Sequence, residues 1–386
     1  MDFALTDDQR AFQDAARSFA RGELAPHAAH WDEASEFPID TIRRAGDIGF
    51  CGIYTPEGAG GLGLNRVEAS IILEELAAGC TSTAAYISIH NMVSWIVANW
   101  GQPAVTEVWA QALASGQKLG SYCLTEPGAG SDAASLKTRA EKRGERYYLS
   151  GSKMFISGAG ATDLLVVMAR TGDNSAKGIS AFAVPADAPG IQYGKLEHKM
   201  GWNCQPTRMI TFDAVEVPEV NRLGAEGEGF RIAMKALDGG RINIAACSIG
   251  TAQAALDRTA AYLNTRKQFG QELAQFQALQ FRIADMLTEL VAARQMVRLA
   301  AWKLDTQSPD ATTYCAMAKR YATDVGFEVC NQALQLHGGY GYIREYPLER
   351  HVRDSRVHQI LEGTNEIMRV IVARAALKEG ATEDLR

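Results

Sequence analysis

Residues 275–303 form a long amphipathic stretch that contains neither glycine nor proline. Its apolar residues recur with helical spacing and would lie near one face of an α-helix: Leu279, Ile283, Met286, Leu290 and Val297. A helix of this length spans roughly 43 Å and cannot bury its apolar face alone. The pattern therefore predicts a bundle of long helices in the C-terminal part of the chain.

Patterns before this stretch divide the chain into helices followed by strands. Thr6–Gln9 and Asn65–Glu68 have the form of capping boxes, each followed by apolar residues at helical spacing. From about residue 120, short β-branched and aromatic segments alternate with Gly, Pro, Asp and Asn. Helical patterns return after about residue 227. We expect an α+β multidomain protein with a helical N-terminal domain (1–119), a central antiparallel β domain (120–226) and a helical bundle (227–386).

Composition excludes several classes of function. The 386 residues are 47% hydrophobic, and their net charge of −6 argues against nucleic-acid binding. The seven cysteines are scattered without a Cys-x-x-Cys pair, which favours a reducing compartment. The acidic N-terminus lacks a signal core, and no apolar run is long enough to cross a membrane. We expect a cytoplasmic protein without a metal site, with His27 and His30 on the surface.

Two glycine-rich segments match the dinucleotide-binding fingerprint. Gly58–Gly63 follows hardly any strand-like sequence and has no acidic residue about twenty positions later. Gly128–Ala133 follows a strand but leads into further strands, so neither segment lies in a βαβ unit. The glycines at 128 and 130 expose backbone N–H groups together with the Thr125 and Ser131 hydroxyls, and this group could hold an anion or the edge of a polar heterocycle.

Glu362 and Glu366 are two carboxylates in an otherwise apolar run. One interpretation is a helix start capped by Thr364 or Asn365. The apolar residues of that helix would then face a core: Ile367, Val370 and Ile371. The alternative is that one carboxylate is buried with a raised pKa and works as a base. This segment alone leaves both interpretations open.

Four motifs in order resemble the acyl-CoA dehydrogenase family: Tyr122–Asp132 (YCLTEPGAGSD), Thr265–Gly270 (TRKQFG), Gln335–Tyr342 (QLHGGYGY) and Leu361–Arg369 (LEGTNEIMR). The resemblance covers the whole chain and implies a central antiparallel β-barrel and a C-terminal four-helix bundle. Lys199–Arg208 and Leu237–Ala245 resemble the isobutyryl-CoA dehydrogenase branch of that family. In this interpretation, Gly239 and Gly240 remove side-chain bulk where a branched acyl group would need width.

The resemblance implies an FAD enzyme that introduces a double bond between the α and β carbons of an acyl-CoA. Isobutyryl-CoA or 2-methylbutyryl-CoA would be the substrate, electron-transfer flavoprotein the electron acceptor, and a homotetramer the assembly. Two alternatives stay open: an acyl-CoA oxidase or flavin monooxygenase of the same fold, and a non-enzymatic DNA-binding relative.

The family motifs also imply site residues. The FAD contacts within the subunit would be Tyr122, Leu124, Thr125, Gly130, Ser131, Phe155, Ile156 and Ser157. The contacts to the FAD of a neighbouring subunit would be Arg266, Phe269, Gln277, Gln335, Gly338 and Gly339. The adenosine side would be met by Thr364 and Glu366, and the substrate by Ser131, Asp238, Arg241, Gly363 and Arg374.

The same resemblance answers the question of the two carboxylates. Glu362 occupies the family's base position, next to Gly363, which allows a ligand to approach the backbone closely. Some relatives carry the base at the position of Gly240, where glycine cannot act. Glu366 would be structural. Arg241 and Arg266 would supply the cations that CoA and FAD phosphates need on an acidic protein.

Overall fold

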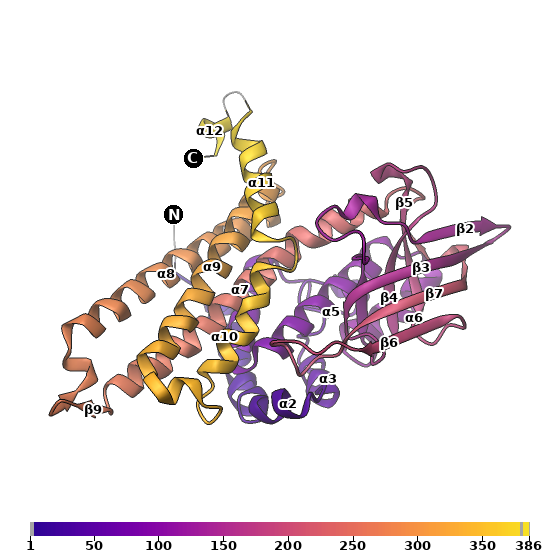
Figure 1. Cartoon of the computed structure of the whole chain (residues 1–386). Coiled ribbons are helices and arrows are strands. Elements are labelled where there is room, and N and C mark those ends of the chain that lie inside the picture. The colour runs from indigo at the N-terminus through magenta and orange to yellow at the C-terminus, as the bar shows by residue number, and fades with distance from the viewer. Residues whose placement is uncertain (1–3, 379–380, 386) are drawn as a thin grey trace.

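The computed structural model describes residues 4–378 and 381–385, which form three parts in the expected order (Figure 1). The first part is helical: α1 Asp7–Phe19, the π-helix η1 Ala20–Leu24, α2 Ala28–Ala34, α3 Ile39–Asp47, the 3₁₀ turn η2 Glu57–Ala59, α4 Arg66–Gly79, α5 Thr81–Trp100 and α6 Pro103–Ala114. Helix α5 is buried along most of its length, at the centre of this part.

The capping boxes expected in this part have different outcomes. Thr6 caps α1, and its exchange of hydrogen bonds with Gln9 confirms the first box. At α4 the prediction is wrong, because Asp305 at the end of α8 supplies the cap. Its carboxylate accepts hydrogen bonds from the backbone N–H of Arg66 (2.8 Å) and Val67 (3.2 Å). A carboxylate distant in sequence therefore stabilises the start of α4.

The second part is a mixed sheet, formed among the described residues by eight strands in the order β6-β7-β3-β2-β4-β5-β8, with β1 beside β4. The strands are β1 Gly120–Cys123, β2 Arg139–Arg143, β3 Arg146–Ser157, β4 Leu164–Arg170, β5 Ile179–Pro185, β6 Ile191–Leu196, β7 Thr207–Pro218 and β8 Arg222–Leu223. Three 3₁₀ turns connect them: η3 Ala133–Ser135, η4 Ala176–Gly178 and η5 Glu219–Asn221.

This sheet differs from the expected antiparallel barrel in two details. The β1–β4 and β2–β4 pairings are parallel, and the hydrogen-bonded path runs from an edge at β6 to an edge at β8. Strand β4 is buried on both faces: Leu164, Val166 and Met168 pack toward α5 and α7, whereas Leu165 and Val167 pack within the sheet domain. This double burial explains why β4 is a continuous apolar run.

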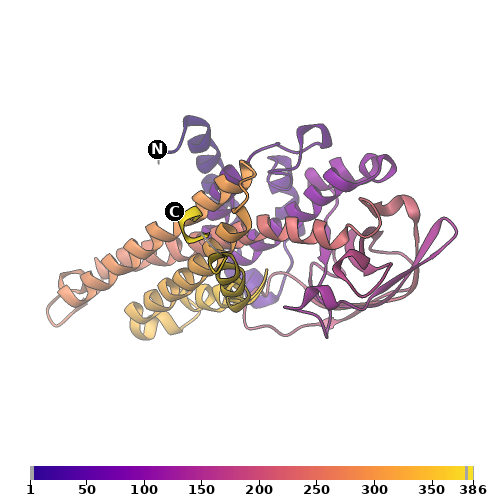
Figure 2. The same cartoon turned by 90° about the horizontal axis from the view of Figure 1, so that it is seen from above.

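The third part confirms the predicted long helices. Helix α8 (Gln277–Asp305) corresponds to the amphipathic stretch and packs with α7 (Gly229–Leu263) and α9 (Ala311–His337). The shorter elements are β9 Lys267–Gln268, β10 Gln271–Glu272, η6 Leu273–Gln275, η7 Gly338–Tyr342, α10 Leu348–Arg356, η8 Val357–Gln359, α11 Asn365–Ala376 and α12 Ala381–Asp384. Both views show α7 extending from the sheet domain to the far end of the bundle, where β9 lies (Figures 1 and 2).

Among the described residues, no helix combines the length and apolar character that a membrane crossing needs.

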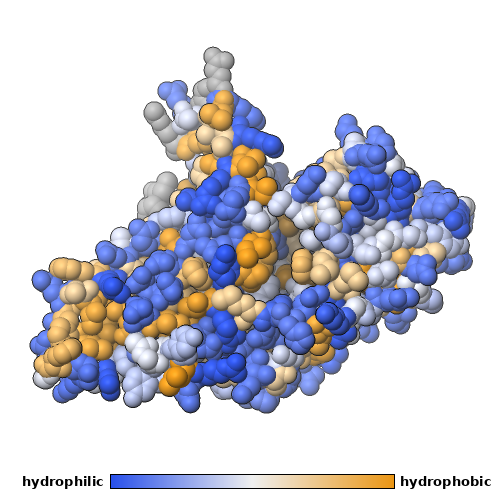
Figure 3. All heavy atoms as spheres, viewed as in Figure 1, coloured by the Kyte–Doolittle hydropathy of each residue, from blue (hydrophilic) through white to orange (hydrophobic). Residues whose placement is uncertain are grey.

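A notch separates α11 from the sheet domain (Figure 3). The loop that joins η8 to α11 contains Glu362 and lies at the base of α11. The fold therefore brings the C-terminal motif to the junction of all three parts.

Candidate active site

The loop that carries Glu362 has an unusual backbone. Glu362 has φ +56° and Gly363 has φ +91°, and a positive φ is costly for a residue with a side chain. Thr364 ends the loop by capping α11, accepting a hydrogen bond from the N–H of Ile367. Conformations of this kind persist only where the surroundings hold them.

Lys319 of α9 donates hydrogen bonds to the Glu362 loop and to the start of α11. Its side chain is fully buried, and Nζ donates hydrogen bonds to the Gly363 carbonyl (2.7 Å) and to Oδ1 of Asn365 (2.9 Å). From α7, Nε of Arg241 donates a longer bond to the Glu362 carbonyl (3.4 Å). Two cations thus fix the backbone on both sides of Gly363 and leave the Glu362 carboxylate free.

Glu362 is half-buried, and one of its two carboxylate oxygens is shielded. Among the described residues, its Oε2 atom is buried without a hydrogen-bond partner. Burial raises the pKa of Glu362 to about 7, although the charges of Arg241 and Lys319 lower it in part. A carboxylate with this pKa removes a weakly acidic proton at neutral pH more readily than an ordinary glutamate does.

Glu366 has a different environment. It lies in the first turn of α11, its side chain is 79% exposed, and it pairs with Arg369 at 3.4 Å. The expectation that Val370 faces a core is wrong. Helix α11 packs on α9 through Asn365 and Met368, which leaves Val370 exposed. Between the two carboxylates, only Glu362 has the environment of a base.

Arg241 is not a free phosphate ligand, and this expectation is corrected. Its side chain is buried, and Nη1 donates to Oδ1 of Asp238 at 2.6 Å. The other oxygen of Asp238 accepts from the Thr312 hydroxyl at 2.7 Å. Since Asp238 already pairs with it, Arg241 anchors the Glu362 loop instead of meeting a phosphate. Arg374, also assigned to the substrate, is exposed in the last turn of α11.

The two glycines before Arg241 do not leave open width. A β-carbon on Gly240 would lie 2.5 Å from Oε2 of Glu362, and one on Gly239 would lie 2.3 Å from Nη1 of Arg66. Each glycine therefore accommodates an ionic side chain that is already in place. This corrects the expectation that the pair makes room for a branched acyl group.

The sheet domain contributes a loop opposite Glu362. Glu126 and Lys153 form a buried ion pair of 2.8 Å beneath it, and Lys153 also donates to the Leu124 carbonyl. Burial would raise the pKa of Glu126, but Lys153 and the donors of Thr138 and Lys137 lower it below its ordinary value. The pair keeps the Thr125–Ser131 segment fixed while Gly130 and Ser131 stay exposed.

The other residues assigned to this side differ in exposure. Phe155 is 63% exposed with φ +58°, whereas the Ile156 side chain belongs to the sheet core and can offer a ligand only its backbone. Ser157 is half-buried. The Tyr122 hydroxyl is buried without a hydrogen-bond partner among the described residues, and burial, with the nearby Glu362, raises its pKa well above the ordinary value.

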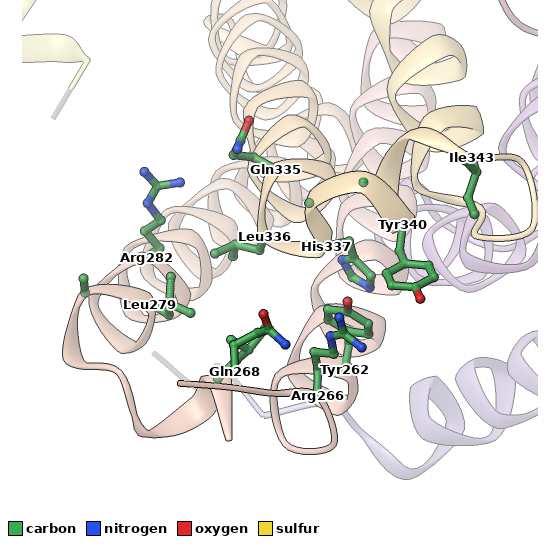
Figure 4. A pocket seen from close by; sticks show the side chains of 14 residues that line it. Tyr262, Arg266, Gln268, Leu279, Arg282, Gln335, Leu336, His337, Tyr340 and Ile343 are labelled. Carbon is green, nitrogen blue, oxygen red and sulfur yellow. The ribbon is translucent and has the colours of Figure 1, made fainter. Parts of the chain in front are cut away.

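A separate pocket of about 620 Å³ lies at the far end of α7 (Figure 4). Of the residues assigned to a neighbouring subunit's cofactor, four line this pocket: Arg266, Gln335, Gly338 and Gly339. Arg266 lies over the ring of Tyr340 at 5.4 Å, and Tyr262 stacks on His337 at 4.3 Å. Phe269 and Gln277 lie near its rim, both exposed, with Phe269 at the hairpin tip.

The two sets of residues are far apart in one chain. Gly240 touches Glu362, and Tyr262 lines the pocket on the same helix, which separates them by roughly 33 Å along α7. The structure thus brings the assigned residues together in two groups at different ends of α7.

Sequence reasoning missed Lys319, Arg66 and the Glu126–Lys153 pair. Lys319, Arg66 and Lys153 lie in ordinary helical or strand patterns, whereas Glu126 lies in the loop after β1. The partners of the two lysines are distant in sequence. Arg320 follows Lys319 directly, so the local sequence does not mark Lys319 as buried.

Three comparisons with known proteins agree with this geometry. The N-terminal, middle and C-terminal domain models of acyl-CoA dehydrogenase match residues 6–117, 121–215 and 227–377. Isobutyryl-CoA dehydrogenase, mitochondrial, of Bos taurus is 52% identical over 375 residues, which cover 97% of this chain and 90% of that protein.

Two solved structures have the same fold. Butyryl-CoA dehydrogenase of Megasphaera elsdenii is 40% identical with a TM-score of 0.94, over 98% of this chain and 100% of that one. PigA, solved with FAD and proline, is 28% identical with a TM-score of 0.94, over 97% of this chain and 98% of that one. The family models, the identity and the shared fold lead to one conclusion: this chain belongs to the acyl-CoA dehydrogenase family.

Proposed function

We propose that this protein uses FAD to oxidise a short branched acyl-CoA, isobutyryl-CoA first and 2-methylbutyryl-CoA second, to the 2-enoyl-CoA. The observation that carries this proposal is the half-buried Glu362, whose Oε2 atom is buried without a hydrogen-bond partner among the described residues and whose pKa is raised to about 7. The 52% identity to a bovine isobutyryl-CoA dehydrogenase supports the choice of substrate.

The residues opposite Glu362 fit a flavin. Phe155 presents an exposed ring, the Tyr122 hydroxyl lacks a partner among the described residues, and nothing lies within 4 Å of a β-carbon built on Gly128 or Gly130. When bound, FAD would supply the acceptor for the hydride of the substrate's β-carbon. Cofactor sites usually combine flat contact to aromatic and backbone groups with a few polar contacts.

In this mechanism Glu362 takes the α-proton. The electron pair of the α C–H bond becomes the new π bond, the β-hydride leaves, and the proton stays on Glu362. Lys319 and Arg241 hold the loop through the Gly363 and Glu362 carbonyls, and neither of these hydrogen bonds involves the carboxylate. The dry surroundings keep the carboxylate basic until the substrate arrives.

We further propose that two chains share each FAD. The pocket at Arg266 lies at the opposite end of α7 from Glu362, so its residues would serve the cofactor of a neighbouring chain. Apolar side chains cover the β9 end of the bundle (Figure 3), and large apolar residues are exposed along α8: Phe281, Leu287, Val291, Leu299 and Trp302. An exposed apolar face of this kind favours burial against a second copy, and a tetramer of two dimers is the proposed assembly.

Electron-transfer flavoprotein is the proposed acceptor of the electrons. The proposed location of this protein is the cytoplasm. All seven cysteines are free thiols, as a reducing compartment favours. The test is an anaerobic panel of acyl-CoAs that follows bleaching of the bound flavin. Higher kcat/KM for octanoyl-CoA than for isobutyryl-CoA would overturn the proposed substrate. Hydrogen peroxide formed stoichiometrically in air would instead identify an oxidase.

A further inference from the structure

Arg66 is a buried cation next to the active site that no motif accounts for. It is the first residue of α4 and only 7% exposed. Its guanidinium carbon lies 3.4 Å above the ring of Tyr54 and 5.1 Å from the ring of Trp95. Asp305 fixes the backbone of Arg66, which leaves the side chain to its aromatic neighbours.

One face of α7 connects Arg66 to the base. Gly239, Gly240 and Asn243 are neighbours on this face, since residues three and four apart lie side by side on a helix. Arg66 occupies the space in front of Gly239, and Glu362 the space in front of Gly240.

Asn243 lies on the same face of α7. Its Nδ2 donates to the Tyr54 hydroxyl at 3.1 Å, below the Arg66 guanidinium. The side chains that face this side of α7 therefore stand in one row, from the Glu362 carboxylate to Arg66 and Tyr54.

Polar atoms in this region lack partners. Within the described part of the chain, four buried atoms here have no hydrogen-bond partner: Nη1 of Arg66, Oδ1 of Asn243, the Tyr122 hydroxyl and Oε2 of Glu362. Buried polar groups are nearly always paired, and a group of unpaired ones marks a place that a ligand completes. Tyr54 lies close enough to both charged groups to interact with them. Burial raises the pKa of Tyr54, Arg66 lowers it in part, and Glu362 raises it further.

We propose that Arg66, stacked on Tyr54, closes the acyl end of the substrate site and limits the length of the acyl chain. This inference rests on the proposed function, because it places the reacting acyl group next to Glu362. In this arrangement the short acyl group of isobutyryl-CoA would end before the guanidinium. A longer alkyl chain would have to displace a cation held against two aromatic rings and bring methylenes against its unpaired N–H group, which is unfavourable.

The experiment compares Arg66→Ala, which removes the guanidinium and its stem, with Arg66→Met, which keeps an unbranched but shorter side chain without charge. Arg294→Met is the matched control, because Arg294 is a half-buried arginine that pairs with Glu74 on α4 instead of facing Gly239. For each protein with bound FAD, kcat/KM is measured for isobutyryl-, hexanoyl- and octanoyl-CoA. Binding of the redox-inert thioethers S-isobutyl-CoA and S-octyl-CoA is measured by calorimetry.

We expect Arg66→Ala to raise the octanoyl-to-isobutyryl ratio of kcat/KM by at least about tenfold, and the affinity ratio of the thioethers in the same direction. Arg66→Met removes the charge and the N–H groups but keeps part of the length, so it should raise both ratios by less than Arg66→Ala. Arg294→Met should stay within about threefold of the wild type. If Arg66→Ala does not fold, Arg66→Leu, which keeps apolar contact with Tyr54 but shortens the side chain, should shift the hexanoyl ratio in the same direction.

Two failures are distinguishable. A wild type that prefers octanoyl-CoA overturns the proposed substrate. A wild type that prefers isobutyryl-CoA, with folded Ala or Leu variants whose ratios equal those of Arg294→Met, overturns only the assignment to Arg66.

Discussion

Gly240 and Glu362 compete for one space, because a β-carbon on Gly240 would lie 2.5 Å from Oε2 and 3.0 Å from Cδ of Glu362. The glycine on α7 is therefore a condition for a base on the loop after η8. A side chain at 240 and a carboxylate at 362 cannot both point into the site.

Gly240→Ala tests this relationship. Alanine in place of glycine within a helix stabilises it by up to about 1 kcal/mol, but here the carboxylate must rotate away. We expect an unchanged or slightly raised melting temperature together with flavin reduction slowed at least about tenfold. The control is Gly22→Ala, since nothing lies within 4 Å of a β-carbon at that position. Normal reduction in Gly240→Ala would contradict the proposed position of the carboxylate.

The variants Glu362→Gln and Glu366→Gln distinguish the proposed base, Glu362, from the carboxylate proposed to be structural, Glu366. Glutamine keeps the shape of Glu362 but cannot take the α-proton. Reduction by isobutyryl-CoA in stopped flow should slow by about 10²–10⁴-fold, with FAD content and acyl-CoA binding retained. Glu366→Gln removes only an exposed first-turn charge that pairs with Arg369, so its reduction rate should be nearly normal. Rapid bleaching in Glu362→Gln would disprove the mechanism.

The raised pKa of Glu362 predicts two pH effects. Because the base must be ionised, kcat/KM should rise with pH through about 7. The stability of the folded protein should change with pH in the opposite direction. Because the pKa of Glu362 is raised from 4.5 to about 7 on folding, the protonated carboxyl contributes to the free energy of unfolding fully below pH 4.5, and this contribution is lost as pH rises through 7.

Glu362→Gln should therefore gain stability relative to the wild type between pH 5 and pH 8, by up to about 3 kcal/mol. Thermal unfolding of the two apoproteins at both pH values measures this difference. A constant difference would mean that the carboxylate has an ordinary pKa.

Lys319→Met removes both the anchor of the Gly363 carbonyl and a buried amine, whose pKa burial lowers to about 7 and which is therefore charged below that pH. We expect kcat to fall about tenfold or more, and the rising limb of the pH profile to move to higher pH, because the Lys319 charge lowers the pKa of Glu362. Lys319→Gln keeps a donor without the charge, so it should recover part of kcat but none of the pH shift. Lys118→Met, at an exposed ion pair with Asp163, is the control. A purely structural lysine would change stability without moving the pH profile.

Arg266→Ala should release FAD and weaken the assembly together, since a cofactor bound only by assembled chains stabilises them by mass action. Absorbance gives the FAD content and light scattering the mass. Lys267→Ala is the matched control, because Lys267 is adjacent and exposed but does not line the pocket. A monomer with stoichiometric FAD would contradict a shared site.

The sequence allowed prediction where the signal was local. The Thr6 cap, the long α8 helix and the presence of a strand at β4 follow from spacing, capping and hydrophobicity over a few residues. The base could be chosen only through its motif, because nothing in the local sequence shows that Oε2 of Glu362 is shielded.

Two of the errors concern contacts between distant segments. Asp305 of α8 displaces Asn65 as the cap of α4, and Arg66 of α4 fills the space that Gly239 of α7 was expected to open. In both cases the partner lies in another helix, and periodicity within one segment carries no information about it. A third error is local: Asp238, three residues before Arg241 on α7, pairs with the guanidinium that was expected to meet a phosphate.

The separation of Glu362 and the Arg266 pocket along α7 has a genetic consequence. In the proposed assembly, a dimer of one Glu362→Gln chain and one Arg266→Ala chain places both defects in one site and leaves the other site intact. Two alleles that are inactive alone should therefore complement each other when expressed together, and two copies of either allele should not.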